Sequence, residues 1–395
     1  MALSNEKVSN FIPNDLVFSI LSKLPLKSLN RFKCVRKTWV MLFENPYFLN
    51  MYRTSFIFNN SYYNDACVLL KHTPLDFEKH SLLYLFSGER FDNKFKSDWS
   101  PSFQDDTHDF NINILGSGIN GILCIYFEGL ISKVVLWNPN IEEFRVIPMN
   151  PTVSVPSYIT DFDRLHGFGY DYIRDDFKVI RYVNFFTNLH YLLDDQINEA
   201  SSEIFYDPLW EIYSLKSNSW RKLDLDIPTS PDSPHALDQV YVNGMCHWFG
   251  ESETNNDNLY LVSFDLGNEV VFVTSIPLLM DDSNNVELVD THLMVLNESI
   301  ALISSDAQTN TFHISVLGEI GVKESWNKLY RVGPLPCLGY YIGTGKNDNI
   351  FFVKEDDELA MCDLSTHTVQ ELGIKGVFDY CQVVIYKKSL LSVIE

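Results

Sequence analysis

The sequence has no stretch of about eighteen uninterrupted apolar residues, and its first ten residues, MALSNEKVSN, are polar. Neither a membrane-spanning segment nor a secretion signal is indicated, so we expect a soluble protein of the cytosol, with the nucleus as a second compartment. The seven cysteines are odd in number, lie far apart and form no Cys-x-x-Cys pair. We therefore expect reduced core thiols instead of a disulfide framework or a thiolate zinc site.

Metal-binding and catalytic signatures are equally scarce. None of the ten histidines pairs with another His or with Cys at metal-ligand spacing, and His247 is expected to be a strand residue near the core. Gly116, Gly118 and Gly121 form a literal G-x-G-x-x-G, but the ILCIYF that follows alternates like a strand, whereas a dinucleotide site needs a helix there. Acidic pairs such as Asp175-Asp176 fall in predicted loops, where a solvated turn is the simpler interpretation. We expect no enzyme activity, no metal and no other cofactor.

Basic residues are missing from a long internal span. No Lys or Arg occurs between Lys222 and Lys323, and this span holds sixteen acidic residues. Residues 1–53 carry eight basic and three acidic residues, whereas the rest of the chain carries 22 basic and 49 acidic residues. An acidic surface repels nucleic acid and attracts basic proteins over long range, although acidity also maintains solubility on its own. We expect neither nucleic acid nor membrane as a partner.

The first fifty residues have a helical pattern. Pro13 is tolerated in a first helical turn, and an apolar stripe at helical spacing follows it. The first helix should end at Pro25, a second short helix follows, and a third should end at Pro46. About 40 residues are near the lower size limit of a stable domain, and their apolar side chains exceed what such a unit can bury, so the surplus should face a partner. The apolar residues are Leu16, Val17, Ile20, Leu21 and Leu24 in the first helix, Leu29 and Phe32 in the second, and Val35, Trp39, Met41 and Phe43 in the third.

Three short motifs in this segment carry a resemblance: Ile12-Pro13, Leu24-Pro25 and the run RFKCVRKTW that ends at Trp39. Together they resemble an F-box, the helical module through which F-box proteins bind a Skp adaptor and, through it, the cullin and RING subunits of a ubiquitin ligase. The resemblance implies a small all-α F-box of three helices in residues 1–53. The alternative is an amphipathic cap whose leucines pack on the rest of the chain. By position, the implied adaptor-binding residues are Ile12, Pro13, Leu16, Ile20, Leu21, Leu24, Pro25, Leu29, Phe32, Val35 and Trp39.

The rest of the chain predicts β structure, because helix-period stretches are nearly absent after Phe43. One kind of hairpin recurs: an apolar strand, a turn rich in Asn, Ser or Gly, and a return strand with an aromatic or aliphatic anchor. From Pro139 to Leu215 the gap is 76 residues, which indicates an insertion in the acidic, tyrosine-rich stretch 184–208. Equivalent leucines, spaced by 51, 51 and 47 residues, are Leu215, Leu266, Leu317 and Leu364.

A second kind of hairpin lies between these, with a tight polar turn. Asn120-Gly121 and Asn243-Gly244 are the pairs that two-residue turns favour, because Asn and Gly tolerate positive φ. Two hairpins in each fifty residues make four strands, which is the content of a β-propeller blade and close to the kelch period. We therefore predict a large all-β, kelch-like propeller of five or six units. Closing strands are expected from ACVLLKH and SLLYLF near the start and CQVVIYKKSLLSVI at the end.

This β region also carries a resemblance, to the F-box-associated interaction domain of plants. It implies a connecting segment with the first propeller strands in residues 54–114 and the interaction domain in residues 115–395. Together with the F-box, the chain is similar to the S-locus F-box family. The resemblance implies a non-catalytic substrate receptor of a Skp-cullin-F-box ubiquitin ligase, with a basic protein such as an S-RNase as one candidate substrate. The motifs are GSGINGILCI, VLWNPNIEEFRVIP, HGFGYDYIRDDFKVIRY, EIYSLKSNSWRKL, VYVNGMCHWF, SFDLGNEVV and ESWNKLY.

Long acidic segments between predicted strands are the candidates for substrate binding, because specificity usually resides in loops. An alternative is a protein-interaction propeller without a ligase role, or a glycan-binding propeller in which Trp137, Trp210, Trp220, Trp248 and Trp326 stack on sugars. Most of these tryptophans recur at the anchor position of the repeat, which favours a place in the blade core. The predicted substrate-binding residues are Asp194, Asp195, Glu199, Glu203, Glu251, Glu253, Asp281 and Asp282.

Overall fold

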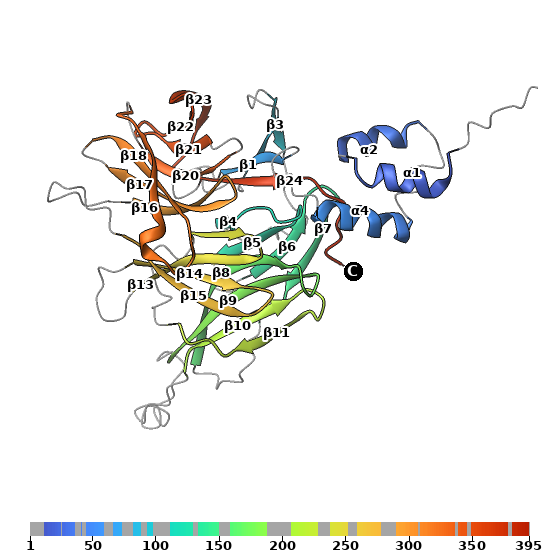
Figure 1. Ribbon diagram of the computed structural model, residues 1–395, viewed down its shortest axis with the longest axis horizontal. Helices are drawn as coiled ribbons and strands as arrows, with labels where there is room; N and C mark the ends of the chain where they lie inside the picture. Colours follow the sequence, from blue (N-terminus) through green and yellow to red (C-terminus); the bar gives the residue numbers. More distant parts are fainter. Residues whose placement is uncertain are drawn as a thin grey trace, which may run out of the picture.

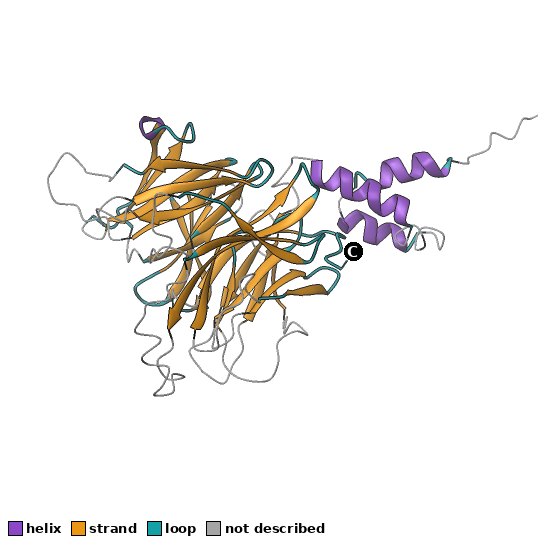
Figure 2. Cartoon of the chain, turned by 90° about the horizontal axis from the view of Figure 1, so that it is seen from below, coloured by secondary structure: helices purple, strands orange, loops and turns teal. Residues whose placement is uncertain are grey.

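A computed structural model of the chain shows a small helical unit beside a large β domain (Figure 1). The helices gather at one side of the strands, as the view in Figure 2 shows. The structure describes residues 12–24, 26–35, 41, 45–58, 66–72, 82–87, 93–97, 111–128, 133–149, 159–187, 207–227, 238–251, 259–277, 290–306, 309–335, 339–345, 349–377 and 381–394.

Two of the three predicted helices are seen: α1 (Asn14–Leu21) and α2 (Leu26–Lys33). α1 follows Pro13 as predicted and ends before Pro25, with the backbone N–H of Ser22 donating to the carbonyl of Phe18 at 2.9 Å. The third predicted helix runs through Val35, Trp39, Met41 and Phe43, and of these four residues the structure describes only Val35 and Met41.

A helix that the sequence did not predict begins where the third one was expected to end. This helix, α4, spans Pro46–Phe58, so the expectation that helical segments are nearly absent after Phe43 is wrong. Proline is favoured at the first position of a helix, and Asn45 caps this one: its Oδ1 accepts hydrogen bonds from the backbone N–H groups of Tyr47 and Phe48, at 2.9 and 3.4 Å. The pair Asn45-Pro46 is therefore a start signal.

The strands form six blades of four antiparallel strands each. Two of the blades share one eight-stranded sheet, joined by a parallel bridge between Gly343 and Val383. The 3-10 helix η3 (Lys323–Ser325) lies between the last two strands of the fifth blade. In order around the ring, the first blade has β24 (Cys381–Lys387), β1 (Ala66–His72), β2 (Leu82–Ser87) and β3 (Asn93–Ser97), and the second has β4 (Asn111–Ile114), β5 (Leu123–Glu128), β6 (Lys133–Asn138) and β7 (Glu143–Ile147). The third blade has β8 (Ile159–Asp171), β9 (Asp176–Thr187), β10 (Leu209–Ser214) and β11 (Ser219–Leu223), and the fourth has β12 (Gln239–Val242), β13 (Met245–Glu251), β14 (Leu259–Asp265) and β15 (Val270–Ser275). The fifth blade has β16 (Asp290–Leu296), β17 (Ser299–Asp306), β18 (Thr311–Leu317) and β19 (Trp326–Val332), and the last has β20 (Tyr340–Thr344), β21 (Asn349–Val353), β22 (Glu358–Asp363) and β23 (Thr368–Lys375).

Strands from the two ends of the β region close the ring, as predicted. β24 pairs antiparallel with β1 along its whole length, from Ala66 opposite Lys387 to His72 opposite Cys381. This mixed blade supplies the sixth unit, so the number of blades that the sequence left open is six.

The predicted tight turns are confirmed by their backbone angles. Asn120 and Gly121 have φ of 50° and 81°, and Asn243 and Gly244 have φ of 50° and 84°. Gly121 is also required sterically, because a Cβ there would lie 2.2 Å from Oγ of Ser389. The three glycines of the G-x-G-x-x-G pattern thus belong to a hairpin that leads into β5, which rules out the dinucleotide interpretation.

Alternation of strand direction gives the propeller two different faces. The turns between the first and second strands of a blade, and between the third and fourth, lie on one face, here called the turn face. Other connections within and between blades lie on the opposite face, here called the connection face. The predicted insertion begins inside a strand, because β9 continues to Thr187, and β8 and β9 are long, with 13 and 12 residues.

α4 joins the helical unit to the turn face of the propeller. Its N-terminal half contributes Phe48 and Tyr52 to the buried core of the helices, and its C-terminal half contributes Ile57 to the propeller core. A guanidinium nitrogen of Arg53 lies 3.0 Å from Oδ2 of Asp175, in the turn between β8 and β9. Figure 1 shows α4 next to β7 and the C-terminal end of the described chain.

The segment after β24, residues 388–394, forms the second part of this joint. Leu390 packs against the helical core, whereas its neighbour Leu391 and Val393 are buried in the propeller core. The amide nitrogen of Asn138 donates to the carbonyl of Leu391 at 2.7 Å and to the carbonyl of Ser389 at 3.3 Å. Adjacent residues of one segment therefore hold two cores together.

Replacing Leu390 by Asp should loosen the helices and leave the propeller intact, because Leu390 packs against the helical core. Removing a half-buried leucine contact costs about 1–3 kcal/mol. We expect faster amide hydrogen exchange in α1, α2 and α4, with unchanged exchange in β4 to β7. Ile394→Asp is the matched control, because Ile394 is 56% exposed. Equal protection of the helices in both variants would contradict this role of the segment.

His166 of β8 lies fully buried between two tryptophans. Its ring centroid is 4.9 Å from that of Trp210 and 5.6 Å from that of Trp248, and within the described residues neither ring nitrogen has a hydrogen-bond partner. Burial, followed by the charge of Arg164, lowers the pKa of His166 from 6.5 to about 3. The imidazole is therefore neutral in the folded protein at neutral pH.

A histidine with a lowered pKa makes stability depend on pH. As the pH falls below 6.5 the unfolded chain binds a proton at this position, whereas the folded chain stays neutral down to about 3, so the free energy of unfolding falls. In His166→Phe this fall should be less steep, by up to about 1.4 kcal/mol per pH unit. Urea unfolding at a series of pH values measures the slope. An unchanged slope in His166→Phe would refute the assignment.

Candidate functional site

The predicted adaptor-binding residues divide into an outward and an inward group. Ile12, Leu16 and Ile20 are 57, 55 and 56% exposed. Leu16 and Ile20 are four residues apart on one face of α1, and Ile12 lies just before the N-cap residue Pro13. We call these three residues the α1 stripe. Val35, just after α2, is 67% exposed, and Pro13 is exposed as well. Of the eleven predicted residues, Pro25 and Trp39 lie outside the described residues.

The inward group forms the core of the helical unit, and its predicted part in adaptor binding stays a prediction. Leu21 and Leu29 are 4 and 0% exposed and pack with Phe48 and Tyr52 of α4. Leu24 and Phe32 are half-buried against the same core. The reason is the helical period: a residue one position after the stripe is turned by about 100° and faces inward.

The helical unit is thus folded and still presents apolar surface. In Figure 1, α1 and α2 lie beyond α4, away from the strands. The α1 stripe therefore does not pack on the propeller. The alternative of an N-terminal packing cap requires such packing. Two exposed aliphatic side chains on one helix face, with a third just before the helix, form a surface suited to a protein partner.

Of the predicted substrate-binding residues, the described part of the chain includes only Glu251. It is half-buried and is the last residue of β13, the second strand of its blade, so it lies on the connection face. The other seven, Asp194, Asp195, Glu199, Glu203, Glu253, Asp281 and Asp282, lie outside the described residues.

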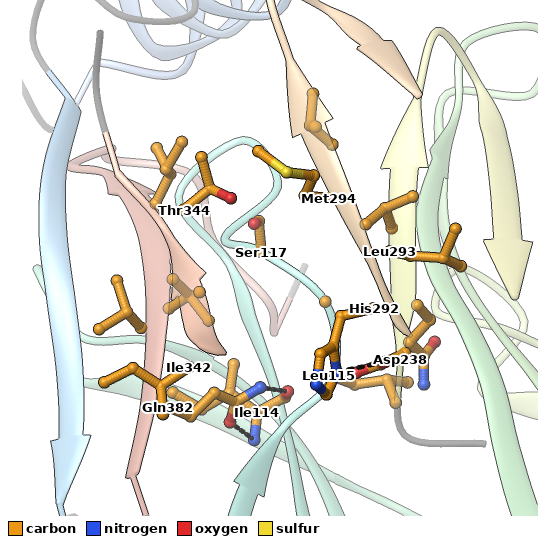
Figure 3. Close-up of a pocket in the computed structure, with 18 of the residues that line it drawn as sticks. Ile114, Leu115, Ser117, Asp238, His292, Leu293, Met294, Ile342, Thr344 and Gln382 are labelled. Carbon is orange, nitrogen blue, oxygen red and sulfur yellow. Dashed lines mark hydrogen bonds and ion pairs between the residues drawn. The ribbon is translucent and has the colours of Figure 1, made fainter. Parts of the chain in front are cut away.

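A cavity of about 340 Å³ lies on the axis of the propeller (Figure 3). The first strands β4, β12, β16, β20 and β24 surround it, and β1 contributes Lys71. Leu115, Leu293 and Ile342 are among its apolar wall residues. The sequence did not predict this channel cavity, because its wall comes from strands far apart in the chain.

Several polar groups of the cavity are paired with one another. Nδ1 of His292 lies 2.7 Å from Oδ2 of Asp238. The side chain of Gln382 satisfies both backbone groups of Ile114, with distances of 2.9 Å to its N–H and 2.6 Å to its carbonyl. Figure 3 shows these two pairs on different parts of the wall. The buried Nζ of Lys71 donates to Oδ1 of Asn113 at 3.3 Å.

Two other polar atoms of the cavity wall have no partner within the described residues. They are the amide nitrogen Nδ2 of Asn113 and the amide oxygen Oε1 of Gln239. The side chain of Gln239 is fixed by its other end, because its Nε2 donates to the carbonyl of Leu165 at 3.3 Å. Both atoms are enclosed by protein atoms, so they are unpaired groups behind the wall and are not open to the cavity.

The channel cavity offers little for catalysis. Burial raises the pKa of the Cys381 thiol to about 11 although Lys71 opposes the shift, so the thiol stays protonated at neutral pH and is a poor nucleophile. Within the described residues, no group of three His, Cys, Asp or Glu side chains is placed to hold a metal ion. The cavity is suited to binding.

Residues singled out for other chemistry are part of the blade cores. Trp137, Trp210, Trp220 and Trp248 are 4, 7, 9 and 1% exposed, so none of them offers a face for a sugar. His247 is buried as predicted, with Nδ1 at 2.8 Å from Oγ of Ser263, and burial lowers its pKa to about 3. Trp326, half-buried, donates from Nε1 to the carbonyl of Ser275 at 3.3 Å.

The family model of the F-box associated beta propeller domain matches residues 75–391 of this chain. The chain belongs to this family. The match begins before residue 115 and includes β2 to β24, whereas β1 lies ahead of it.

Several relatives from Arabidopsis thaliana extend over most of this F-box associated propeller protein. An F-box protein is 25% identical and covers 80% of this chain and 74% of its own length. A putative F-box protein is 23% identical and covers 93 and 95% of the two chains. The F-box/WD-40 repeat-containing protein 1 is 24% identical and covers 92 and 78%.

Solved structures resemble the chain only weakly. A lectin of Aleuria aurantia has a TM-score of 0.42 at 9% identity and covers 80% of this chain and 96% of the lectin. A fungal alcohol oxidase in complex with copper has a TM-score of 0.39 at 14% identity, with coverage of 80 and 66%. Neither likeness bears on the function.

Family membership gives the general role of the chain. F-box proteins are substrate receptors of Skp-cullin-F-box ubiquitin ligases and are non-catalytic subunits of these complexes. Among the residues described, no helix is long and apolar enough to cross a membrane.

Proposed function

We propose that this chain binds a Skp adaptor through the α1 stripe and holds a basic protein substrate on the connection face of its propeller. The observation that carries the proposal is the α1 stripe itself. The helical unit has a filled core of its own, and three aliphatic side chains at and just before α1 remain more than half exposed. Such a surface is costly in water unless a partner covers it.

Charge supports the adaptor half of the proposal. Residues 1–53 have eight basic and three acidic residues, so an acidic adaptor would be attracted to this end of the chain. An interface of standard size buries about 1,600 Å², and a few central apolar residues dominate its energy. Ile12, Leu16 and Ile20 are our candidates for these central residues, with Val35 beside them.

The joint between helices and propeller supports a positioning role. α4 and residues 388–394 pack into both cores, so the α1 stripe keeps a fixed direction relative to the propeller. The joint is on the turn face, which leaves the connection face open to a substrate. A receptor of this geometry acts by proximity: it converts the encounter of substrate and ubiquitin-loaded enzyme into an effectively intramolecular one.

Charge also supports the substrate half. The span without Lys or Arg, from Lys222 to Lys323, supplies most of β12 to β19, that is, two neighbouring blades. Its sixteen acidic residues would attract a basic protein. We include the acidic residues predicted for substrate contact, such as Glu251, in the proposed substrate-binding surface. S-RNases are the basic substrate class that the S-locus resemblance suggests.

A double substitution in the α1 stripe, Leu16→Asp with Ile20→Asp, should abolish adaptor binding without unfolding the chain. Both side chains are exposed, so the thermal unfolding temperature should stay within the wild-type range. Loss of two central apolar contacts weakens binding by about 100-fold or more. Co-purification with a plant Skp adaptor, followed by calorimetric titration, measures the change.

Two further variants separate binding from folding. Leu21→Ala, in the helical core, should lower stability by about 2–5 kcal/mol, so its effect on the adaptor does not identify a contact. Val369→Asp, an exposed position on β23, repeats the change of apolar to acidic on the propeller and should bind like the wild type. Full adaptor binding by the Leu16/Ile20 variant would exclude the stripe as the docking surface.

A further inference from the structure

The outer strand of the fourth blade, β15, differs in charge from the outer strands of the other five blades. Its sequence is VVFVTS, without a charged residue. An outer strand carries unpaired backbone groups along one edge, and natural proteins protect such edges with charged side chains, above all Lys. The charged residues of the other outer strands are Lys94 and Lys96 in β3, Glu143 and Arg145 in β7, Arg221 and Lys222 in β11, Lys328 and Arg331 in β19, and Glu371 and Lys375 in β23. Among the six outer strands that the structure describes, β15 alone lacks this protection.

The first half of β15 is apolar and open to solvent. Val270 and Phe272 are 45 and 42% exposed, and they share one face of the strand because they are two residues apart. Val271 and Val273, on the other face, are half-buried. The side chains along this half are therefore apolar on both faces.

The backbone edge of this half is available for pairing. β15 ends the strand order of its sheet, with β14 as its neighbour. Within the described residues, no backbone–backbone hydrogen bond links residues 270–275 to a segment other than β14. In an antiparallel strand every second residue directs its N–H and C=O away from the neighbouring strand, so this edge can accept a further strand.

The second half of β15 is held by the fifth blade. The backbone N–H of Gly321 donates to Oγ1 of Thr274 at 2.7 Å, and Nε1 of Trp326 donates to the carbonyl of Ser275 at 3.3 Å. These contacts fix the end of the strand. The edge that is open for pairing is therefore short and its position is set by the neighbouring blade.

Charge indicates a basic partner. β15 lies inside the span from Lys222 to Lys323 that has no Lys or Arg between its ends, although the whole chain has 30 such residues among 395. The turn between β18 and β19, which contacts the held end of β15, exposes Glu319 and Glu324 and has one basic residue, Lys323. Acidic groups near the edge attract a partner with Lys or Arg.

Charges at the other end of β15 are matched within the protein. Oε1 of Glu269, just before the strand, lies 3.8 Å from a guanidinium nitrogen of Arg174 and 3.7 Å from Nζ of Lys178, and it also pairs with Arg221. All three basic residues belong to the third blade. The attraction for a basic partner therefore comes from the fourth and fifth blades.

We propose that β15 is an edge at which the fourth blade adds a strand supplied by an extended segment of a basic protein. Main-chain hydrogen bonds give such pairing its affinity, and alternate side chains give it specificity. The residues opposite Val270 and Phe272 should be β-branched or aromatic, because such cross-strand pairs stabilise antiparallel sheets. Lys or Arg should flank them. A second copy of this chain fits less well, because it would bring two base-free spans together.

This inference rests on the substrate half of the proposed function, because the partner has the same sign of charge. It adds a second surface, since β15 is at the outer rim of the propeller and the substrate was placed on the connection face. The two surfaces are separated by where a bound partner protects the chain.

Fluorescence anisotropy with the full chain tests the edge. The labelled probe is the synthetic peptide acetyl-KKTVTVTVKK-amide, which has alternating valines and basic flanks. One matched peptide, acetyl-EETVTVTVEE-amide, has acidic flanks, and another, acetyl-KKTVPVTVKK-amide, has a proline that removes a backbone donor. We expect the first peptide to bind at least about tenfold more tightly than either of the others, and added salt should weaken its binding.

Amide hydrogen exchange locates the bound peptide. Exchange in residues 270–273 should slow when the first peptide is bound, because an added strand pairs with the outward N–H groups. Exchange in β7 and β23 should stay unchanged. Protection of another outer strand, or of the connection face, without protection of β15 would place the peptide elsewhere and contradict the proposal.

Two variants test the apolar side of the edge. Phe272→Lys gives β15 the kind of charge that the other outer strands carry, and Phe272→Thr removes the ring without adding a charge. We expect the first variant to weaken the basic peptide by more than about tenfold and the second by about threefold. Phe272 is exposed, so the thermal unfolding temperature should stay within the wild-type range. Val146→Lys is the matched control, because Val146 is 44% exposed on the outer strand β7, and it should bind the peptide like the wild type.

The proposal fails if the basic peptide does not bind, if the acidic peptide binds equally well, or if Phe272→Lys binds like the wild type. Sedimentation of the chain alone tests the competing occupant. A dimer that Phe272→Lys dissociates would assign the edge to a second copy and overturn the proposal. None of these measurements involves the α1 stripe, so a failure here leaves the proposed binding of the adaptor unaffected.

Discussion

The pairing of β24 with β1 is the constraint on which the rest of the structure depends. Seven residue pairs join the end of the β region to its beginning and make the sixth blade. This closure brings the first strands of the blades around one axis and so creates the channel cavity. It also delivers residues 388–394 to the turn face, where they meet α4. Closure, cavity and helical joint are consequences of one antiparallel pair.

Local signals predicted the blades well, because each hairpin depends on residues close in sequence. Asn120-Gly121 and Asn243-Gly244 require positive φ, and the structure has it. The start of α4 was missed because Pro46 was interpreted as a stop, although Asn45 before it is an N-cap residue. Here too the signal was local, and the combination of cap and proline distinguishes a start from an end.

The sites were harder to predict, because they depend on distances between parts of the chain. The helical period explains why Leu16 and Ile20 are exposed and Leu21 is buried. It does so only once the core of the helical unit is known. No local pattern marks the residues of the cavity wall, such as Asn113 on β4 and Gln239 on β12, which line one cavity only when the ring is closed. The proposal that acidic residues bind the substrate depends on charge. Charge acts over a long range and does not define the positions of the contacting residues.

Closure by β24 has a consequence for the order in which the protein is made. On the ribosome, β1 leaves early and β24 follows all the other described strands, so the growing propeller has open strand edges until the last blade is complete. Contacts between such distant segments form slowly, and unpaired edges invite association with other chains. The contact between residues 388–394 and the helical unit forms at the same stage, because these residues directly follow the closing strand β24. The orientation of the helices on the propeller is therefore fixed only after the final strand and the segment behind it have been made.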